Sequence, residues 1–204
     1  MDFSKFRTPY IKKDVIKIKA DTFRKMYWND SIPVDIEKII DVKLGIDIIP
    51  TPDMMKLCNT DALISSDFTS INVDNDWYND ERNMNRLRFS LAHEMGHFVL
   101  HKDIYGSFKI ESLDDFYNFI ENISQQTYRS MEWQAQTFAS YLLVPRDMVR
   151  SVYKKIYDEV RQSASMDFSN IEEEFLNDLM SVPMSKEFGI SAEAMFYVLS
   201  EYKN

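Results

Sequence analysis

The chain has 204 residues, a formal net charge of −9 at pH 7 and one cysteine, Cys58. The acidic balance argues against a general nucleic-acid binder, which needs clustered Lys and Arg, and a single cysteine excludes an internal disulfide framework, so Cys58 is expected to be a buried inert thiol. Hydrophobic residues form 45% of the chain, enough for a core, yet no run approaches membrane-spanning length and the start lacks the apolar core of a signal peptide, so we expect a cytoplasmic protein.

Helical spacing organises the beginning of the chain. A first helix is predicted from apolar residues that repeat at helical intervals: Ile16, Ala20, Phe23 and Tyr27. Either Asp30 or Ser31 can cap a second helix, and Pro33 suits its first turn. Gly45 is expected to end this second helix.

Three short runs rich in β-branched residues predict strands at 46–49, 62–65 and 70–73, with a turn at 66–69. The acidic stretch 74–80 is expected to be a solvated loop, because the spacing of its carboxylates does not fit a calcium-binding EF-hand. An exposed strand edge can pair with an extended peptide. We expect strand 70–73 or its hairpin partner to supply such an edge.

Helical periodicity dominates the rest of the chain. Residues 84–101 form an amphipathic pattern, and a second apolar stripe surrounds Glu132. Between them, apolar residues predict an inserted helix: Leu113, Phe116, Tyr117, Phe119, Ile120 and Ile123. After Pro145, further helices are expected near 147–163, 171–187 and 191–202. The whole pattern predicts an α+β fold, mostly helical, with a small mixed or antiparallel sheet of about three strands packed on helix 84–101.

The most informative motif is His93-Glu94-Met95-Gly96-His97, which matches H-E-x-x-H within a predicted helix. Positions i and i+4 share one helical face, so both imidazoles can reach one metal ion. Glu94 is rotated by about 100° from His93 and can instead hold a water beside that ion. A hydrogen-bonded structural pair is the plain alternative, but all three histidines of the chain, including His101, lie on this face. We therefore predict a hydrolytic site with one Zn²⁺ per chain.

Such a site needs a third protein ligand. His101 lies two turns from His93, too far for one ion to reach all three rings, so it is expected to support a ligand, to line the rim or to be a helix-end cation. Glu132 is the better candidate, because a carboxylate inside an apolar stripe is costly unless a charge compensates it. The stripe comprises Tyr128, Met131, Ala135, Phe138, Ala139 and Leu142. The alternative is a buried salt bridge to one of three arginines, Arg86, Arg88 or Arg129. Another carboxylate such as Glu121 would serve as ligand if Glu132 did not.

Two segments resemble a known family, the ImmA/IrrE metallopeptidases. Residues 88–97, RFSLAHEMGH, are similar to the family pattern R-F-[ST]-L-A-H-E-[LIM]-G-H, and residues 132–145 are similar to E-x-x-A-x-x-F-A-x-x-L-L-x-P. The resemblance covers roughly residues 15–203 and implies a zincin-like, gluzincin-type site. Its metal ligands would be His93, His97 and Glu132, and its general base Glu94. It also implies a metallopeptidase domain over 1–145 with a helical extension over 146–204 packed on it, or one continuous domain.

The resemblance further implies a site-specific endopeptidase that cleaves a bacterial or phage helix-turn-helix repressor and so derepresses mobile-element or stress genes. A protein that binds such a repressor without cutting it is the alternative, and it would have no need of Glu94. Residues 186–191 look like the turn of a helix-turn-helix, yet residues 171–204 carry seven acidic against two basic side chains, a net charge of −5. We therefore expect a protein substrate and neither direct nucleic-acid binding nor a membrane partner.

Overall fold

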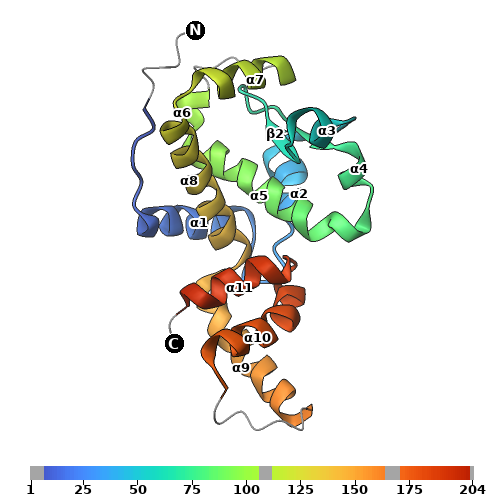
Figure 1. Cartoon of the computed structure of the whole chain (residues 1–204), viewed down its shortest axis with the longest axis vertical. Helices are drawn as coiled ribbons and strands as arrows, with labels where there is room; N and C mark the ends of the chain where they lie inside the picture. Colours follow the sequence, from blue (N-terminus) through green and yellow to red (C-terminus); the bar gives the residue numbers. More distant parts are fainter. Residues whose placement is uncertain (1–6, 106–111, 164–170, 203–204) are drawn as a thin grey trace.

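A computed structural model describes residues 7–105, 112–163 and 171–202 of the chain. The predicted α+β fold, mostly helical with a small sheet, is confirmed (Figure 1). The longer helices are α1 (Lys13–Tyr27), α5 (Met84–Leu100), α7 (Leu113–Asn122), α8 (Gln125–Leu143), α9 (Arg146–Ser163), α10 (Glu173–Phe188) and α11 (Ala192–Glu201). The short ones are α2 (Ile36–Lys38), η2 (Ile39–Leu44), α3 (Met54–Cys58), α4 (Asn75–Tyr78), η3 (Glu81–Asn83) and α6 (Lys102–Tyr105). The strands are β1 (Asp47–Thr51), β2 (Ala62–Ile64) and β3 (Ser70–Asp74). Among the described residues, no helix combines the length and apolarity needed to cross a bilayer.

Helix α1 is amphipathic and packs one face on α8. The apolar residues of its inner face are buried as predicted: Ile16, Ala20 and Phe23. Phe23 contacts Phe138 of α8 edge-on, with ring centroids 5.8 Å apart. The buried guanidinium of Arg24 lies 3.5 Å from the carboxylate of Asp147 in α9. Helix α1 therefore contacts α8 through Phe23 and the first turn of α9 through Arg24.

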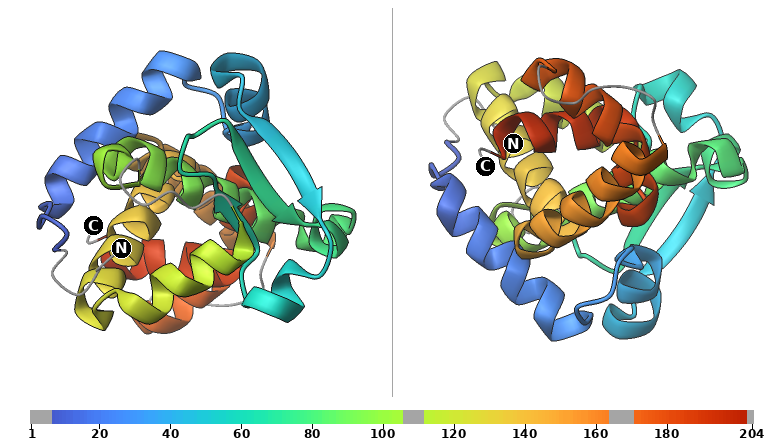
Figure 2. Two further views of the ribbon diagram at one scale, coloured as in Figure 1. Left: turned by 90° about the horizontal axis from the view of Figure 1, so that it is seen from above. Right: turned by 90° about the horizontal axis from the view of Figure 1, so that it is seen from below.

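The sheet is mixed, with strand order β1-β3-β2. Strand β3 runs parallel to β1 and antiparallel to β2. Because β3 has a neighbour on each side, the second of the two predicted alternatives holds, in which the hairpin partner of strand 70–73 offers the free edge. The edge beside α5 belongs to the hairpin partner β2. The strands and α1 lie on different sides of the two central helices, α5 and α8 (Figure 2).

The free side of β2 faces the centre of the molecule. The backbone N–H of Asp74 donates to the carbonyl of Asp61 at 2.9 Å, so the odd-numbered residues of this segment direct their backbone groups at β3. By alternation, Ala62 and Ile64 direct theirs away from the sheet. The N–H of Ile64 accordingly donates to the side chain of Glu94 in α5 at 2.9 Å.

Two local predictions are wrong. The second helix begins at Asp35, whose carboxylate accepts the Lys38 N–H at 3.0 Å, while Asp30 is engaged by Arg24 instead. Pro33 therefore precedes the helix, although the predicted end at Gly45 is confirmed.

The stretch 74–80 is not all loop, because the buried carboxylate of Asp74 caps α4. The predicted inserted helix is confirmed as α7. The side chains of Cys58 and Leu113 lie outside the described part of the structure.

Helices α5 and α8 cross unusually closely at one glycine. A Cβ built on Gly96 would lie 2.7 Å from the Cα and 2.8 Å from the carbonyl oxygen of Ala135. These are backbone atoms, which cannot turn aside as a flexible side chain can. The contact places Glu132, three residues before Ala135, opposite the histidine-bearing face of α5.

The C-terminal helices are attached to α5 by a polar contact. The guanidinium of Arg88 donates to the carbonyl of Gly189 at 2.9 Å. Gly189 ends α10 in the left-handed conformation, with φ of 64°. On the other side of these helices, Lys13 of α1 pairs with Glu201 of α11 at 2.9 Å. One cluster of buried residues contains members from both 1–145 and 146–204. The division after residue 145 stays a prediction.

The substitution Gly96→Ala is expected to lower the free energy of unfolding by about 1–3 kcal/mol, because the added methyl overpacks the crossing with α8. At an open helical position the same change would stabilise the protein by about 1 kcal/mol through helix propensity. The exposed residue Asn85 of α5 provides the matched control, since Asn85→Ala should be neutral or stabilising. Denaturant unfolding measures both. A Gly96→Ala protein as stable as wild type would contradict the tight crossing.

Candidate active site

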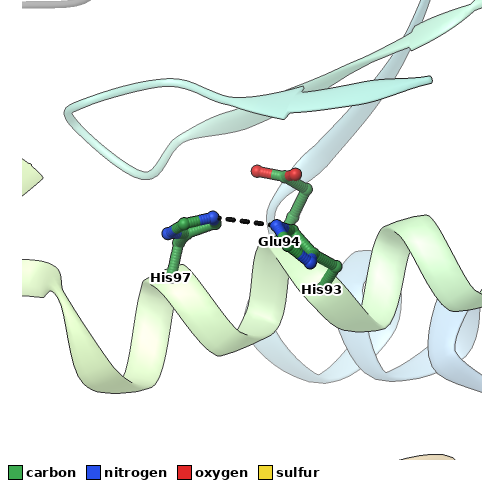
Figure 3. Close-up of side chains that lie close together, drawn as sticks. All are labelled: His93, Glu94 and His97. Atoms are coloured by element: carbon green, nitrogen blue, oxygen red, sulfur yellow. Dashed lines mark hydrogen bonds between the residues drawn. The ribbon is translucent and has the colours of Figure 1, made fainter. Parts of the chain in front are cut away.

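Helix α5 brings two imidazoles to one point. The Nε2 atoms of His93 and His97 lie 3.0 Å apart, and the two rings meet edge-on (Figure 3). His97 is buried, whereas the side chain of His93 keeps 18% of its surface exposed. The four-residue spacing alone produces this pairing, because successive turns of a helix stack their side chains on one face. The motif geometry predicted from the sequence is therefore present.

Helix α8 adds a carboxylate to the same point. Glu132 places Oε2 at 3.1 Å from Nε2 of His93 and Oε1 at 3.5 Å from Nε2 of His97. Burial raises the pKa of this carboxyl, but the nearby imidazoles of His93 and His97 outweigh burial and hold the pKa below its usual range. Glu132 is therefore an anion that faces the Nε2 atoms of both rings.

The salt-bridge alternative for Glu132 is not supported. Arg86 is bidentate to Asp61, at 2.7 and 3.0 Å, and Arg88 is bound to Gly189. Arg129, the third candidate for a buried salt bridge, has an exposed side chain. Glu121, the alternative ligand, is exposed as well. Among the described residues, the basic side-chain nitrogen atoms within 4.0 Å of the Glu132 carboxylate belong to the imidazoles of His93 and His97.

His101 extends the histidine pair into the core. Its Nδ1 lies 3.0 Å from Nδ1 of His97, and its Nε2 lies 3.0 Å from Oε1 of Gln134. The amide nitrogen of Gln134 donates to the Pro9 carbonyl at 3.0 Å, which orients the amide. The amide oxygen requires a proton on Nε2 of His101, so Nδ1 of His101 accepts from Nδ1–H of His97. In the neutral His97 ring, a proton on Nδ1 leaves Nε2 free, which is the form that binds a metal.

His101 is thus a positioning residue behind His97. It is 1% exposed, and burial together with the neighbouring His97 lowers its pKa to about 3. A neutral ring buried in this way is not a helix-end cation, so that alternative is wrong. The sequence motif could not identify Gln134 as its partner, because the two residues are 33 positions apart.

The donor set fits a metal ion. With its proton on Nδ1, His97 presents a lone pair at Nε2 that faces the Oε1 lone pairs of Glu132 at 3.5 Å. Two acceptors in contact repel each other unless a cation lies between them. The two nitrogen atoms lie 3.0 Å apart, and each lies 3.1 or 3.5 Å from one of the two Glu132 oxygens, distances close to the edge of about 3.3 Å expected for tetrahedral zinc with ligand bonds of about 2.0–2.1 Å. Two nitrogens and one carboxylate are also a donor set that zinc accepts.

Glu94 lies beside this donor set without joining it. Ligand atoms of His93, Glu94 and His97 lie within 4.8 Å of one another, but Oε2 of Glu94 accepts the Ile64 N–H at 2.9 Å. Figure 3 shows the Glu94 carboxylate turned toward the neighbouring strand. The side chain is 5% exposed, and burial raises the pKa of its carboxyl, an effect that His97, His93 and the Ile64 N–H offset only in part. A carboxylate with a raised pKa, fixed next to a metal site, is suited to proton transfer.

These groups open into a cleft of about 420 Å³. One wall is the segment 59–63 that leads into β2, and the other consists of α5 and α8. Helices α6, α7 and α8 each contribute one aromatic residue that no sequence motif had assigned to the site: Tyr105, Phe116 and Tyr128. Tyr128 precedes Glu132 by four residues on one helical stripe, a spacing that could have identified it. Burial raises the pKa of the Tyr128 hydroxyl, so the group stays protonated and able to donate.

A helix with H-E-x-x-H packed against a small sheet defines a class, the zincin-like metallopeptidases. The particular family comes from comparison with known proteins. The model of the peptidase M78 family, the IrrE N-terminal-like domain, matches residues 77–200, more than half of the chain. The chain belongs to this family of metallopeptidases.

The chain is also similar to a solved structure of a Mycobacterium tuberculosis transcriptional regulator. The two share 14% sequence identity and a TM-score of 0.47, over 91% of this chain and 46% of that chain. The chain therefore spans about half the length of that protein. No curated protein matches the sequence significantly.

The substitution His101→Ala is expected to weaken zinc affinity by about 10–100-fold, because His97 loses the acceptor that fixes its tautomer. Gln134→Ala should act in the same direction through His101. The exposed residue Gln126 on the same helix is the matched control, and Gln126→Ala should bind zinc as wild type does. Competition with a chromogenic chelator measures the affinities, and circular dichroism verifies the fold. Unchanged zinc affinity in a folded His101→Ala protein would refute the positioning role.

Proposed function

We propose that the protein is a zinc-dependent endopeptidase with one Zn²⁺ per chain held by His93, His97 and Glu132. The observation that carries this proposal is the convergence of their donor atoms from two helices, with Glu94 fixed beside them. The membership of a metallopeptidase family supports the same reaction class. A protein that only binds its partner would not need a buried Glu94, whose desolvation is a cost without catalytic benefit.

The chain supplies the proton chemistry of peptide hydrolysis. A zinc ion at the three ligands would provide a Lewis acid that lowers the pKa of water and polarises the scissile carbonyl. Glu94 accepts the proton of the attacking water and then delivers it to the leaving nitrogen. The Ile64 N–H holds the Glu94 carboxylate in place during both transfers. His101 and Gln134 keep His97 in the tautomer that binds the metal.

The edge of β2 is suited to align an extended substrate. Ala62 directs its backbone groups into the cleft, and its carbonyl also accepts from the Thr60 hydroxyl at 3.2 Å. A peptide paired with this edge lies over the metal ligands, because β2 packs on α5. Only a segment that can become extended can pair in this way. We therefore infer cleavage in flexible linkers rather than in folded domains.

The resemblance to ImmA/IrrE proteins supports a particular substrate, a helix-turn-helix transcriptional repressor of bacterial or phage origin. Cleavage at one site would relieve repression of mobile-element or stress genes. A repressor substrate would place the reaction in the cytoplasm, without direct contact of this chain with nucleic acid or membrane.

Glu132→Ala is expected to lose zinc more completely than any positioning variant, because it removes a ligand rather than its support. The matched control is Glu121→Ala, which removes an exposed carboxylate from α7 and should keep one zinc per chain. Elemental analysis of protein purified without a metal-affinity tag gives the stoichiometry. Full zinc content in Glu132→Ala together with loss in Glu121→Ala would transfer the ligand role to Glu121.

Glu94→Gln is expected to keep zinc and the fold but to lose proteolysis by at least about a hundredfold, because the amide cannot accept the proton. The measurement incubates zinc-loaded protein with a helix-turn-helix repressor encoded beside it and maps the products by mass spectrometry. One dominant cut, abolished by a chelator and by Glu94→Gln, is the expected result. Release of the repressor by Glu94→Gln as effective as by wild type would indicate binding without catalysis. Unselective digestion of casein would indicate a general peptidase.

A further inference from the structure

A second cavity of about 310 Å³ lies next to the active-site cleft, between α8, α11 and the start of α9. We name it the α8–α11 pocket. Phe89 and Gln136 line both this pocket and the cleft. Glu132, Gln136 and Ser140 follow one another at four-residue spacing, so one face of α8 leads from the metal ligands into the pocket. A peptide leaving the metal site along α8 therefore reaches this pocket next.

The pocket contains a fixed guanidinium. Nη1 of Arg146 donates to the Val144 carbonyl at 2.8 Å, and Nη2 donates to the hydroxyl of Ser140 at 3.0 Å. The guanidinium also stacks on the Tyr141 ring, with its central carbon 4.6 Å from the ring centroid. All these partners are neutral. Burial lowers the pKa of Arg146, and Tyr141 and two more distant carboxylates offset this in part.

Within the part of the chain that the structure describes, no carboxylate lies within 4.0 Å of Arg146. The carboxylate that lines the pocket, Glu201, is paired with Lys13 at 2.9 Å. The three charged side chains of the lining therefore sum to +1, in a protein whose net charge is −9. A held guanidinium whose described hydrogen-bond partners are all neutral, the carbonyls of Val144 and Ser140 and the hydroxyl of Ser140, is a receptor for a planar anion.

Four aromatic residues also line the pocket. Phe89 and Tyr141 form the inner wall, and Trp133 and Tyr197 stand at the mouth with 43% and 63% of their surfaces exposed. These rings can cover the backbone and apolar atoms that flank a charged group, and they lower the local dielectric around it. An ion pair between Arg146 and an entering carboxylate is therefore stronger in this pocket than on an open surface.

We propose that the α8–α11 pocket binds a carboxylate of the substrate and makes the enzyme selective for an acidic residue near the cut. This inference rests on the proposed peptidase function. Two residues of the pocket lining, Gln136 and Ser140, lie about 6 Å and about 12 Å beyond Glu132 along α8, at about 1.5 Å per helical residue. An extended peptide advances about 3.3 Å per residue, so the acidic residue lies two to four positions from the scissile bond. The carboxylate comes from an Asp or Glu side chain or from the end of a chain.

The test digests a library of decapeptides with the zinc-loaded full chain and sequences the products. In these peptides, one position at a time carries Glu, Gln or Lys. Each peptide is made both with a free and with an amidated C-terminus. Wild type is expected to prefer Glu over Gln by about tenfold to a hundredfold at one position two to four residues from the cut. Dependence on the free C-terminus instead of on Glu would identify the chain end as the source, which also supports a carboxylate pocket.

The variant Arg146→Gln should reduce this preference to near unity, and Arg146→Lys should restore part of it. The matched control is Arg150→Gln, the same change at an exposed position of α9 outside the pocket, which should leave the preference unchanged. Because Arg146 also binds the backbone, Tyr197→Glu provides a second variant that places a competing carboxylate at the mouth and leaves those bonds intact. An equal preference in wild type, Arg146→Gln and Tyr197→Glu overturns the proposal, as does the absence of any acidic preference.

A binding arm separates this inference from the proposed function. Calorimetry measures the affinity of the same Glu and Gln peptides for zinc-loaded wild type, or for Glu94→Gln if wild type cleaves them. If no peptide is cut, the peptidase proposal fails, and tighter Arg146-dependent binding of the Glu peptides still supports the pocket. Equal affinity for Glu and Gln peptides overturns the pocket whether or not cleavage occurs.

Discussion

The close crossing of α5 and α8 at Gly96 and Ala135 is the constraint on which the site depends. Packed helix axes usually stay about 8–10 Å apart because side chains separate them. Here the missing Cβ lets backbone approach backbone. Glu132, one turn before Ala135, then reaches the nitrogen atoms that flank Gly96 on α5. Metal ligands tolerate errors of only a few tenths of an ångström, so a wider crossing would leave two histidines without their third partner.

Burial of so many polar groups is possible because each one has a hydrogen-bond partner. Glu94 is held by the edge strand β2, and His97 by His101 at the end of the same helix. Gln134 completes the chain of hydrogen bonds and ties it to the segment that precedes α1 through Pro9. The active site is therefore the place where the sheet, both central helices and the N-terminal segment meet. A change in any of these contacts would alter the positions of the proposed metal ligands as well as the fold.

The C-terminal helices serve the site from the outside. Arg88 of α5 ties the turn after α10 to the helix that carries the histidines, and α11 closes one side of the α8–α11 pocket. In the proposed enzyme, one end of α8 would bind the metal, and the other end forms a cavity with a fixed Arg146. The chemistry would then be set by α5 and the N-terminal half of α8, and the recognition of neighbouring substrate residues by the C-terminal half.

The sequence by itself determined whatever depends on local spacing. The pairing of His93 with His97 follows from the turn of one helix. Glu132 could be selected as the third site residue because it is a carboxylate within an apolar stripe. Contacts between distant segments were decided by the tertiary structure. Strand order made β2 the edge instead of β3, and Gln134 turned His101 into a neutral support for His97. The physical reason is that helical periodicity is written in neighbouring residues, whereas strand order and hydrogen-bond partners depend on how separate elements pack.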